Sequence, residues 1–307
     1  MSTRYSVVLG CPRSGTTYLS RLLKTIPEFE SVVGTLLPVA IPHVVSQPLD
    51  RPIYEALAVG FERSLDAFLH SGRYHSRAAA LQKWAQAPAG LRTLWRALQG
   101  RRDQPKLMVY KEPALAWSPQ FVLDALPDAR IIHIYRDGRD CANSLVRSYD
   151  VLTDARLSDL NGSEVRLGRP YDPTGTDPRI LPWWVDDLKG DAFMAATPYA
   201  RAAWMWSVMV QRCHDVFSAP AVVDAGNVMM LKYEDLVSAP HTWGPAVLDF
   251  LGGERTAAFD KLLDEARTSS IGKYKRRDAR EIAEAEAIAA SQLSTHGYPL
   301  PGHLQVV

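Results

Sequence analysis

The sequence predicts an α/β protein in three layers, with a central parallel sheet between two layers of helices. Short apolar segments alternate along the chain with longer segments whose apolar residues have helical spacing. Strands that are apolar throughout are typical of parallel sheets with helices on both faces. The chain is also large enough for a sizeable core, because 47% of its 307 residues are apolar. We therefore expect a single domain over residues 1–307.

Apolar pattern and glycine or proline breaks place the individual elements. The predicted strands are residues 5–9, 106–110, 130–135 and 228–231. The predicted helices are residues 14–23, 65–69, 78–98, 121–126, 141–149, 200–217, 245–251, 259–267 and 280–291, the last of them exposed. Residues 151–190 differ, because glycines and prolines recur there between Gly162 and Pro182. We expect an irregular insertion, and such a segment in a compact domain is often a functional lid.

Charge and cysteine content exclude several classes of protein. The formal net charge is only +1 at pH 7, whereas a protein that coats nucleic acid is expected to be strongly basic. Cys11, Cys141 and Cys213 are too scattered for a disulfide framework or a zinc site, which favours a reduced, cytoplasmic protein. We expect no membrane span, no secretory signal and no metal site. The sequence leaves the oligomeric state open, and a homo-oligomer is possible.

A glycine-rich segment lies between the first predicted strand and the helix after it. Gly10, Gly15 and Thr17 fit the phosphate-loop pattern G-x-x-x-x-G-K-[ST], which requires this strand–loop–helix context. Thr16 stands where the pattern has a lysine, and Arg13 inside the loop is the available cation. Backbone N–H groups at the start of a helix can still bind an anion there. The missing lysine disfavours an ATPase or kinase. The alternative is a turn in which the glycines only shape the backbone.

A second anion site is predicted where the strand at residues 130–135 ends. Arg136 follows this strand directly, and Ser144 lies eight residues later on the next predicted helix. An arginine beside a helix N-terminus favours anions. Asp137 and Asp140 are better explained as the cap and the first-turn acid of that helix. The alternative is that the arginine forms only a surface ion pair, which contributes little stability.

Together these motifs resemble the sulfotransferase family that uses 3′-phosphoadenosine 5′-phosphosulfate (PAPS). The first is similar to the 5′-phosphosulfate loop of tyrosylprotein and bacterial sulfotransferases, with the residues Pro12, Arg13, Ser14, Gly15, Thr16 and Thr17. Arg136 and Ser144 are similar to the family's pair for the 3′-phosphate. Weaker similarities are residues 111–113, residues 231–236 with Tyr233, and residues 270–273 with Ser270 and Lys273.

The resemblance implies a P-loop-like sulfotransferase fold and a transferase that needs no metal. PAPS would be the co-substrate, and its sulfuryl group would pass to a hydroxyl of a small molecule such as a metabolite, lipid or sugar. Arg13 and Lys111 would stabilise the departing group, while Thr16 and Thr17 would hold the 5′-phosphate. Sulfuryl transfer is expected to resemble phosphoryl transfer, where positioning and electrostatics dominate catalysis. The alternatives are a P-loop nucleotide kinase and a non-catalytic nucleotide-binding protein of the same fold.

The acceptor hydroxyl needs a general base, and this chain lacks the base residues of the family at the matching positions. Cytosolic relatives have a histidine two residues after the strand lysine, where this chain has Pro113. Tyrosylprotein relatives have a glutamate after the first helix, but residues 31–37 contain no acid. Glu112 and His43 are the candidates that remain, although Glu112 could instead form a structural ion pair with Lys111.

The acceptor is expected to bind outside the strands and the phosphate loop. Candidate segments are residues 36–53, 61–98 and 151–190. In the last of these, Trp183, Trp184 and Tyr171 are candidates for an apolar lid, although tryptophan pairs also serve as ordinary packing anchors.

Overall fold

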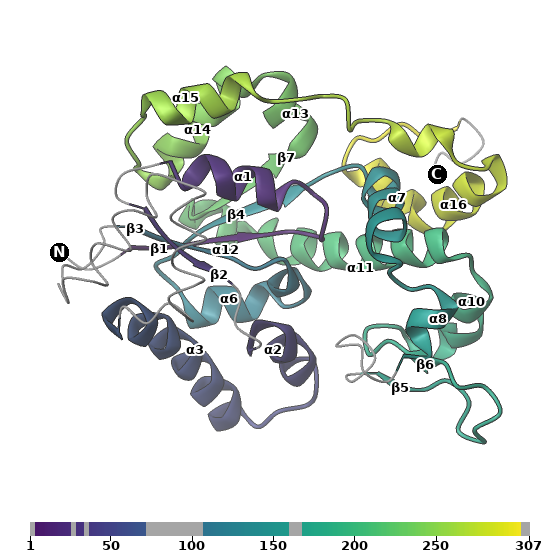
Figure 1. The fold of residues 1–307 in the computed structure, drawn as a ribbon. Coiled ribbons are helices and arrows are strands. Elements are labelled where there is room, and N and C mark those ends of the chain that lie inside the picture. The colour runs from purple at the N-terminus through teal and green to yellow at the C-terminus, as the bar shows by residue number, and fades with distance from the viewer. Residues whose placement is uncertain (1–3, 26–28, 34–36, 72–106, 160–167, 302–307) are drawn as a thin grey trace.

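Figure 1 shows a computed structural model, which describes residues 4–25, 29–33, 37–71, 107–159 and 168–301. At its centre is a five-stranded sheet with the order β2-β3-β1-β4-β7. All neighbouring strands in it are parallel. The strands are β1 (Arg4–Leu9), β2 (Phe29–Val33), β3 (Leu107–Lys111), β4 (Arg130–Tyr135) and β7 (Val228–Lys232). The predicted α/β class with a central parallel sheet is therefore confirmed.

One layer of helices lies above the sheet in Figure 1 and shares a buried apolar cluster with it. Its helices are α1 (Thr16–Leu23), α13 (Tyr233–Ser238), α14 (Pro240–Leu251) and α15 (Ala257–Asp264). Val8, Ile132 and Leu231 are the strand residues at the centre of this cluster, and all three are fully buried. Apolar side chains of α1 and α15 cover them, which fixes the start of α1 at the carboxyl end of β1.

A larger apolar cluster covers the opposite face of the sheet and includes Val7, Leu9 and Ile131. The helices on this side are α2 (Leu37–Val45), α3 (Arg51–Ser71), α6 (Pro119–Ala125), α7 (Gly138–Tyr149), α11 (Pro198–Phe217), α12 (Pro220–Ala225) and α16 (Ala279–Thr295). Helix α11 crosses this layer and packs against α7 and α16 (Figure 1). Trp206 of α11 is fully buried, and its indole N–H donates to the carbonyl oxygen of Arg136 over 3.0 Å.

The predicted insertion at residues 151–190 is more regular than expected. Its described part contains α8 (Asp154–Leu157), a small antiparallel pair β5 (Arg169–Pro170) and β6 (Ile180–Leu181), and the 3₁₀ helix η2 (Asp187–Lys189). Helix α10 (Gly190–Ala195) then leads into α11. Two further 3₁₀ helices, η1 (Pro113–Trp117) and η3 (Lys273–Arg276), follow β3 and precede α16.

The four predicted strands are confirmed, each shifted by at most one residue at an end. Strand β2 was missed, because it lies at the edge of the sheet and carries Glu30 and Ser31 instead of a continuous apolar run. The exposed helix predicted at residues 280–291 exists within α16, but its exposure is wrong. Ala285 and Ala289 are buried there because α16 packs on α11. The helix predicted at residues 78–98 lies outside the described residues.

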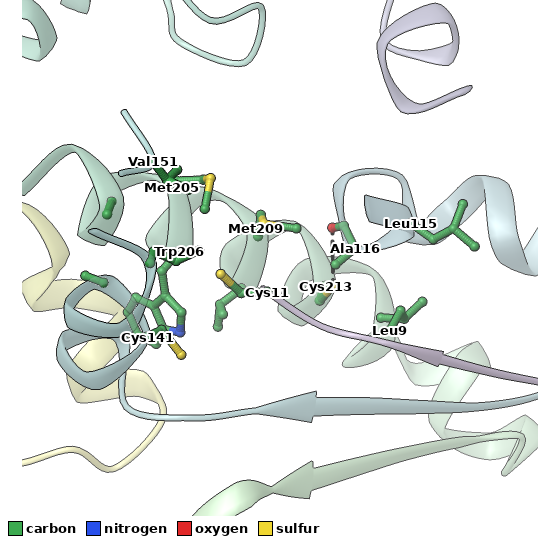
Figure 2. Packing of buried hydrophobic residues seen from close by; sticks show 14 of the residues in the cluster. Leu9, Cys11, Leu115, Ala116, Cys141, Val151, Met205, Trp206, Met209 and Cys213 are labelled. Carbon is green, nitrogen blue, oxygen red and sulfur yellow. Dashed lines mark hydrogen bonds between the residues drawn. The ribbon is translucent and has the colours of Figure 1, made fainter. Parts of the chain in front are cut away.

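All three cysteines are free and buried. Figure 2 shows Cys11, Cys141 and Cys213, the last on α11, where its thiol donates to the carbonyl oxygen of Ala116 over 3.4 Å. Burial raises the pKa of each thiol, including that of Cys11 inside the glycine-rich loop. A protonated thiol is a poor nucleophile, so these cysteines contribute packing.

The described ranges contain no helix that is both long and apolar enough to cross a lipid bilayer. In the same ranges, no three or more His, Cys, Asp or Glu side chains are grouped so as to hold a metal ion.

Candidate active site

The glycine-rich loop joins the carboxyl end of β1 to the start of α1, as predicted. A Cβ atom at Gly10 would lie 2.0 Å from the carbonyl oxygen of Ile134, so only glycine fits beside β4. Gly15 has a φ of 101° and caps the N-terminus of α1. Thr16 is buried and Thr17 is exposed at that terminus. The first turn of α1 therefore offers N–H groups with no intrahelical partner, which is the usual setting for binding a phosphate.

Gly15 also faces an aromatic ring, which gives a testable prediction. A Cβ atom there would lie 2.3 Å from the ring of Tyr233, and the positive φ would strain any other residue. We expect Gly15→Ala to lower the free energy of unfolding by at least about 1 kcal/mol more than Gly175→Ala does. Gly175 is the matched control, because its φ is 80° but nothing lies within 4 Å of its added Cβ. Equal losses in urea unfolding of the two variants would show that the contact with Tyr233 contributes nothing.

Arg13 stands in the loop with a φ of 74°, a value that is uncommon for a residue other than glycine. Its side chain turns towards α7, where Nε donates to Ser144 Oγ over 2.9 Å. Its Nη1 donates to the hydroxyl of Tyr149 over 3.4 Å, and the guanidinium lies 5.4 Å from the centre of that ring. Two residues of α7 thus hold the exposed cation of the loop above the start of α1.

Arg136 lies beneath the same loop and is 7% exposed. Its Nη1 donates to the backbone oxygen of Arg13 over 3.4 Å, and its Nη2 lies 3.3 Å from Asp140. The guanidinium lies 4.8 Å from the centre of the Tyr233 ring and donates to the carbonyl oxygen of Ser270. The hydroxyls of Tyr233 and Ser270 are 2.9 Å apart. The structure therefore brings three distant predicted site residues together, at positions 136, 233 and 270.

Among the described residues, Ser144 and Lys273 form no hydrogen bond with the cluster of Arg136, Tyr233 and Ser270. Ser144 contacts Arg13, while the side chain of Arg136 points to Asp140 and Ser270. Lys273 lies in η3 and is exposed. The buried Nε of Arg136 has no hydrogen-bond partner in the described part of the chain. A buried donor without a partner is costly, so a ligand that brought an acceptor to this nitrogen would be favoured.

The acids of the second motif have the structural roles predicted for them. Asp137 caps α7 by accepting from the N–H of Arg139 over 2.9 Å. Asp140 in the first turn accepts from the N–H groups of Gly272 and Tyr274 over 2.7 and 3.1 Å. This aspartate therefore ties the segment after α15 to the helix that carries Ser144.

Lys111 and Glu112 stand at the carboxyl end of β3, next to the end of β1. Lys111 pairs with Val8 in the sheet register, and the N–H of Glu112 donates to the carbonyl oxygen of Val8 over 3.1 Å. The Glu112 carboxylate caps η1 by accepting from the N–H of Ala114 over 3.1 Å. Burial raises the pKa of this carboxyl, and the N–H of Ala114 and the charge of Lys111 oppose the shift. No ion pair between Lys111 and Glu112 is found in the described part of the chain.

The loop and the end of β3 line one pocket of about 550 Å³. The predicted site residues Arg136, Ser144, Tyr233, Ser270 and Lys273 are not among its lining residues. Its polar end is formed by Pro12, Arg13, Thr16, Thr17, Lys111 and Glu112. Its other end is almost entirely apolar and is formed by Trp117, Leu145, Val151, Leu152, Pro182, Trp183, Trp184, Met205 and Met209. Tyr149 and Arg156 also line it. The pocket therefore joins a cationic end at the start of α1 to an aromatic one.

The predicted aromatic residues of the 151–190 segment divide into two groups. Trp183 and Trp184 line the pocket, and Trp184 stacks on Trp117 with ring centres 5.1 Å apart. Tyr171 is not a lining residue, and its hydroxyl donates to Asp191. His43 is also outside the lining, with its ring packed edge-on against Trp183 at 5.6 Å.

Several pocket residues were missed by the sequence analysis. Trp117 lies six residues after Lys111, and η1 turns it into the pocket. Met205 and Met209 lie four residues apart on α11, which is the signal of a single helical face, but core residues give the same signal. Tyr149 lies at the end of α7, where nothing in the sequence indicates a contact with Arg13.

Comparisons with known proteins show which family the chain belongs to. A family model described as the sulfotransferase family matches residues 7–167, which is more than half of the chain. The chain belongs to the sulfotransferase family. The matched region of this sulfotransferase includes the glycine-rich loop, Lys111 and Arg136, whereas Tyr233 and Ser270 lie beyond it. No curated protein matches the sequence.

Solved structures similar to this sulfotransferase include two domains of biosynthetic systems. The sulfotransferase domain of the Synechococcus PCC 7002 olefin synthase matches with a TM-score of 0.50 and 19% identity, covering 98% of this chain and 97% of that one. The sulfotransferase domain from the curacin biosynthetic pathway matches with a TM-score of 0.51 and 16% identity, covering 98% and 99%. These similarities confirm the predicted sulfotransferase fold.

Proposed function

We propose that this sulfotransferase moves the sulfuryl group of PAPS to a hydroxyl of a small-molecule acceptor. The supporting observation is the pocket itself, which is lined both by Arg13 and Lys111 beside the start of α1 and by the aromatic side chains of Trp117, Trp183 and Trp184. A nucleotide with a 5′-phosphosulfate needs the first part, and an acceptor of modest size with an apolar body needs the second.

The side chains of the site fit a nucleotide that carries phosphate at both its 5′ and 3′ positions. The N–H groups at the start of α1, with Thr16 and Thr17, would hold the 5′-phosphate. Arg136 supplies a buried Nε donor without a partner among the described residues, beside the hydroxyls of Tyr233 and Ser270. We propose that this cluster binds the 3′-phosphate and that Ser144 and Lys273 assist it.

Bound PAPS would supply an activated sulfuryl group whose departure leaves negative charge on the bridging oxygen. Arg13 and Lys111 line the pocket beside the start of α1, where they stabilise that charge. Glu112 lines the pocket next to Lys111, and its raised pKa brings it closer to that of an effective general base. Glu112 therefore takes the proton of the acceptor hydroxyl. His43 is the less favoured candidate, because Trp183 lies between it and the pocket.

The acceptor lies against the tryptophans of η1 and of residues 182–184. These aromatic faces bind an apolar body well, and the polar lining residues are concentrated at the nucleotide end. Part of the 151–190 segment thus covers the acceptor, which is the lid role that the sequence predicts.

Transfer of radiolabelled sulfate from PAPS to a panel of hydroxyl compounds tests this function. The panel includes 2-naphthol, a long-chain alcohol and glucose, and we expect transfer to members with an apolar body. Transfer of phosphate from ATP with no transfer from PAPS would favour the kinase alternative. Binding of the spent nucleotide without transfer to any member would favour the non-catalytic alternative.

A further inference from the structure

Arg212 on α11 is a largely buried cation without a carboxylate partner. Its guanidinium lies beside the rings of Trp117 and Trp183, 5.5 Å from the centre of each, and the two ring centres are also 5.5 Å apart. Its Nη1 donates to the carbonyl oxygen of Trp117 over 3.0 Å. That is its one hydrogen bond within the described ranges, which also place no acid within ion-pair distance of it. Nε and Nη2 are therefore left without an acceptor.

Three arginines are buried among the described residues, and they differ from Arg212. Arg136 is paired with Asp140 at 3.3 Å, and Arg201 is paired with Asp154 at 2.8 Å. Arg139 has two carboxylates at 2.7 Å. Burial lowers the pKa of Arg212. Burial also acts to lower the pKa of Arg136 and Arg139, but their acidic neighbours outweigh it, so the pKa of each is raised. A partly buried guanidinium without a carboxylate partner is free to pair with a bound anion, whereas the other three arginines are already paired.

A second pocket of about 630 Å³ lies beside Arg212, and we call it the α11 pocket. The lining residues are Lys189, Ala192, Trp204, Ser207, Val208, Gln211, Arg212 and Ile288. Two of them are cationic and none is acidic. Trp204, Val208 and Ile288 provide apolar walls, and Ser207 and Gln211 are polar but uncharged. None of these residues lines the candidate active site, so the α11 pocket is separate from it.

Arg212 also lines a third pocket of about 440 Å³, which is less suited to an anion. Asp215 lines that pocket, and its charge would repel an anionic ligand. The absence of acids in the lining of the α11 pocket, together with Lys189, favours the α11 pocket as the anion site.

We propose that the α11 pocket binds a small molecule that has an apolar body and a carboxylate group. The carboxylate contacts the free edge of Arg212, because a planar guanidinium matches the two oxygens of a carboxylate. Lys189 contributes a second positive charge, and the apolar body lies against Trp204, Val208 and Ile288. Arg212 also contacts Trp117 and Trp183, so the bound carboxylate lies one residue away from the aromatic walls of the active site.

A ligand-detected NMR titration tests this site without any sulfuryl donor. The probes are 3-phenylpropionate and its neutral amide, which share the apolar body and differ in charge. We expect the carboxylate to bind wild-type protein at least about tenfold more tightly than the amide. Arg212→Met and Lys189→Met should each reduce that preference, and Arg212→Met should abolish it. A wild-type protein without the preference, or an Arg212→Met variant that keeps it, would overturn the proposal.

Two further variants locate the bound carboxylate and guard against misfolding. Asp215→Asn should change the preference only slightly, because Asp215 reaches the α11 pocket only through Gln211, whose side-chain amide donates to it. A stronger preference in Asp215→Asn with no effect of Lys189→Met would place the carboxylate in the third pocket and contradict the proposal. Arg212→Lys keeps a cation and should retain part of the preference if Arg212→Met does not fold. Lys189 is exposed, so its variant should fold in either case.

Discussion

Replacing Arg13 with alanine should lower kcat by about 10²–10³-fold while changing the affinity for 3′,5′-adenosine bisphosphate by no more than a few fold. The proposed role of Arg13 is to stabilise charge that develops on the bridging oxygen as the sulfuryl group departs. That charge is largest in the transition state, so its loss affects turnover more than ground-state binding. Steady-state kinetics with PAPS, combined with nucleotide titration, separate the two effects.

Two variants serve as controls for the Arg13 prediction. Arg13→Lys keeps a cation at the same backbone position, with its φ of 74°, and should recover part of the lost turnover. Tyr149→Phe removes the hydroxyl that accepts from Nη1 but keeps the ring beneath the guanidinium, so its effect on turnover should be several-fold at most. Turnover of Arg13→Ala within fivefold of wild type would remove Arg13 from the transition state.

Replacing Glu112 with glutamine should lower kcat by about 10²–10⁴-fold, because the acceptor hydroxyl loses its general base. The amide oxygen of glutamine can still accept from the N–H of Ala114, so the cap of η1 is kept and the fold should be unaffected. His43→Gln tests the competing base, and its effect should be much the smaller. A loss confined to His43→Gln would reverse the assignment.

The pH dependence gives an independent test of Glu112. A base must be deprotonated to act, so wild-type turnover should rise with pH through the pKa of this carboxyl. Burial raises that pKa above its usual 4.5, so the acidic limb of the profile should lie at a higher pH than an exposed glutamate would give. Glu112→Gln should lose this limb. An unchanged limb in the variant would assign the titration to another group.

The sheet was predictable because its central strands are mostly apolar, with Ser6 in β1 and His133 in β4 as the buried polar exceptions. Helices cover both faces of β1 and β4, so neighbouring residues that point to opposite faces are both apolar. Val7 and Val8 are such a pair in β1, and Ile131 and Ile132 are another in β4. β2 is an edge strand and carries no continuous apolar run, so pattern alone could not place it. The burial of α16 depends on contact with α11, more than 60 residues earlier, which local periodicity does not encode.

The site was predictable where backbone geometry dictates residue type. Gly10 and Gly15 are required by close approaches to β4 and Tyr233, and such requirements leave a motif in the sequence. The contact between Arg13 and Ser144 could not be foreseen, because it depends on how the loop turns the arginine towards α7. The aromatic lining of the pocket was only partly predictable. Trp183 and Trp184 were expected there, whereas the position of Trp117 depends on the turn of η1.

Calorimetric titration of 3′,5′-adenosine bisphosphate in the presence of a metal chelator tests the central claim most directly. The nucleotide should bind without a divalent metal, and at least about tenfold more tightly than adenosine 5′-monophosphate, because Arg136 offers a buried donor to the 3′-phosphate. Equal affinity for the two nucleotides, or binding that requires a divalent metal, would contradict the assignment of this chain as a PAPS-dependent enzyme.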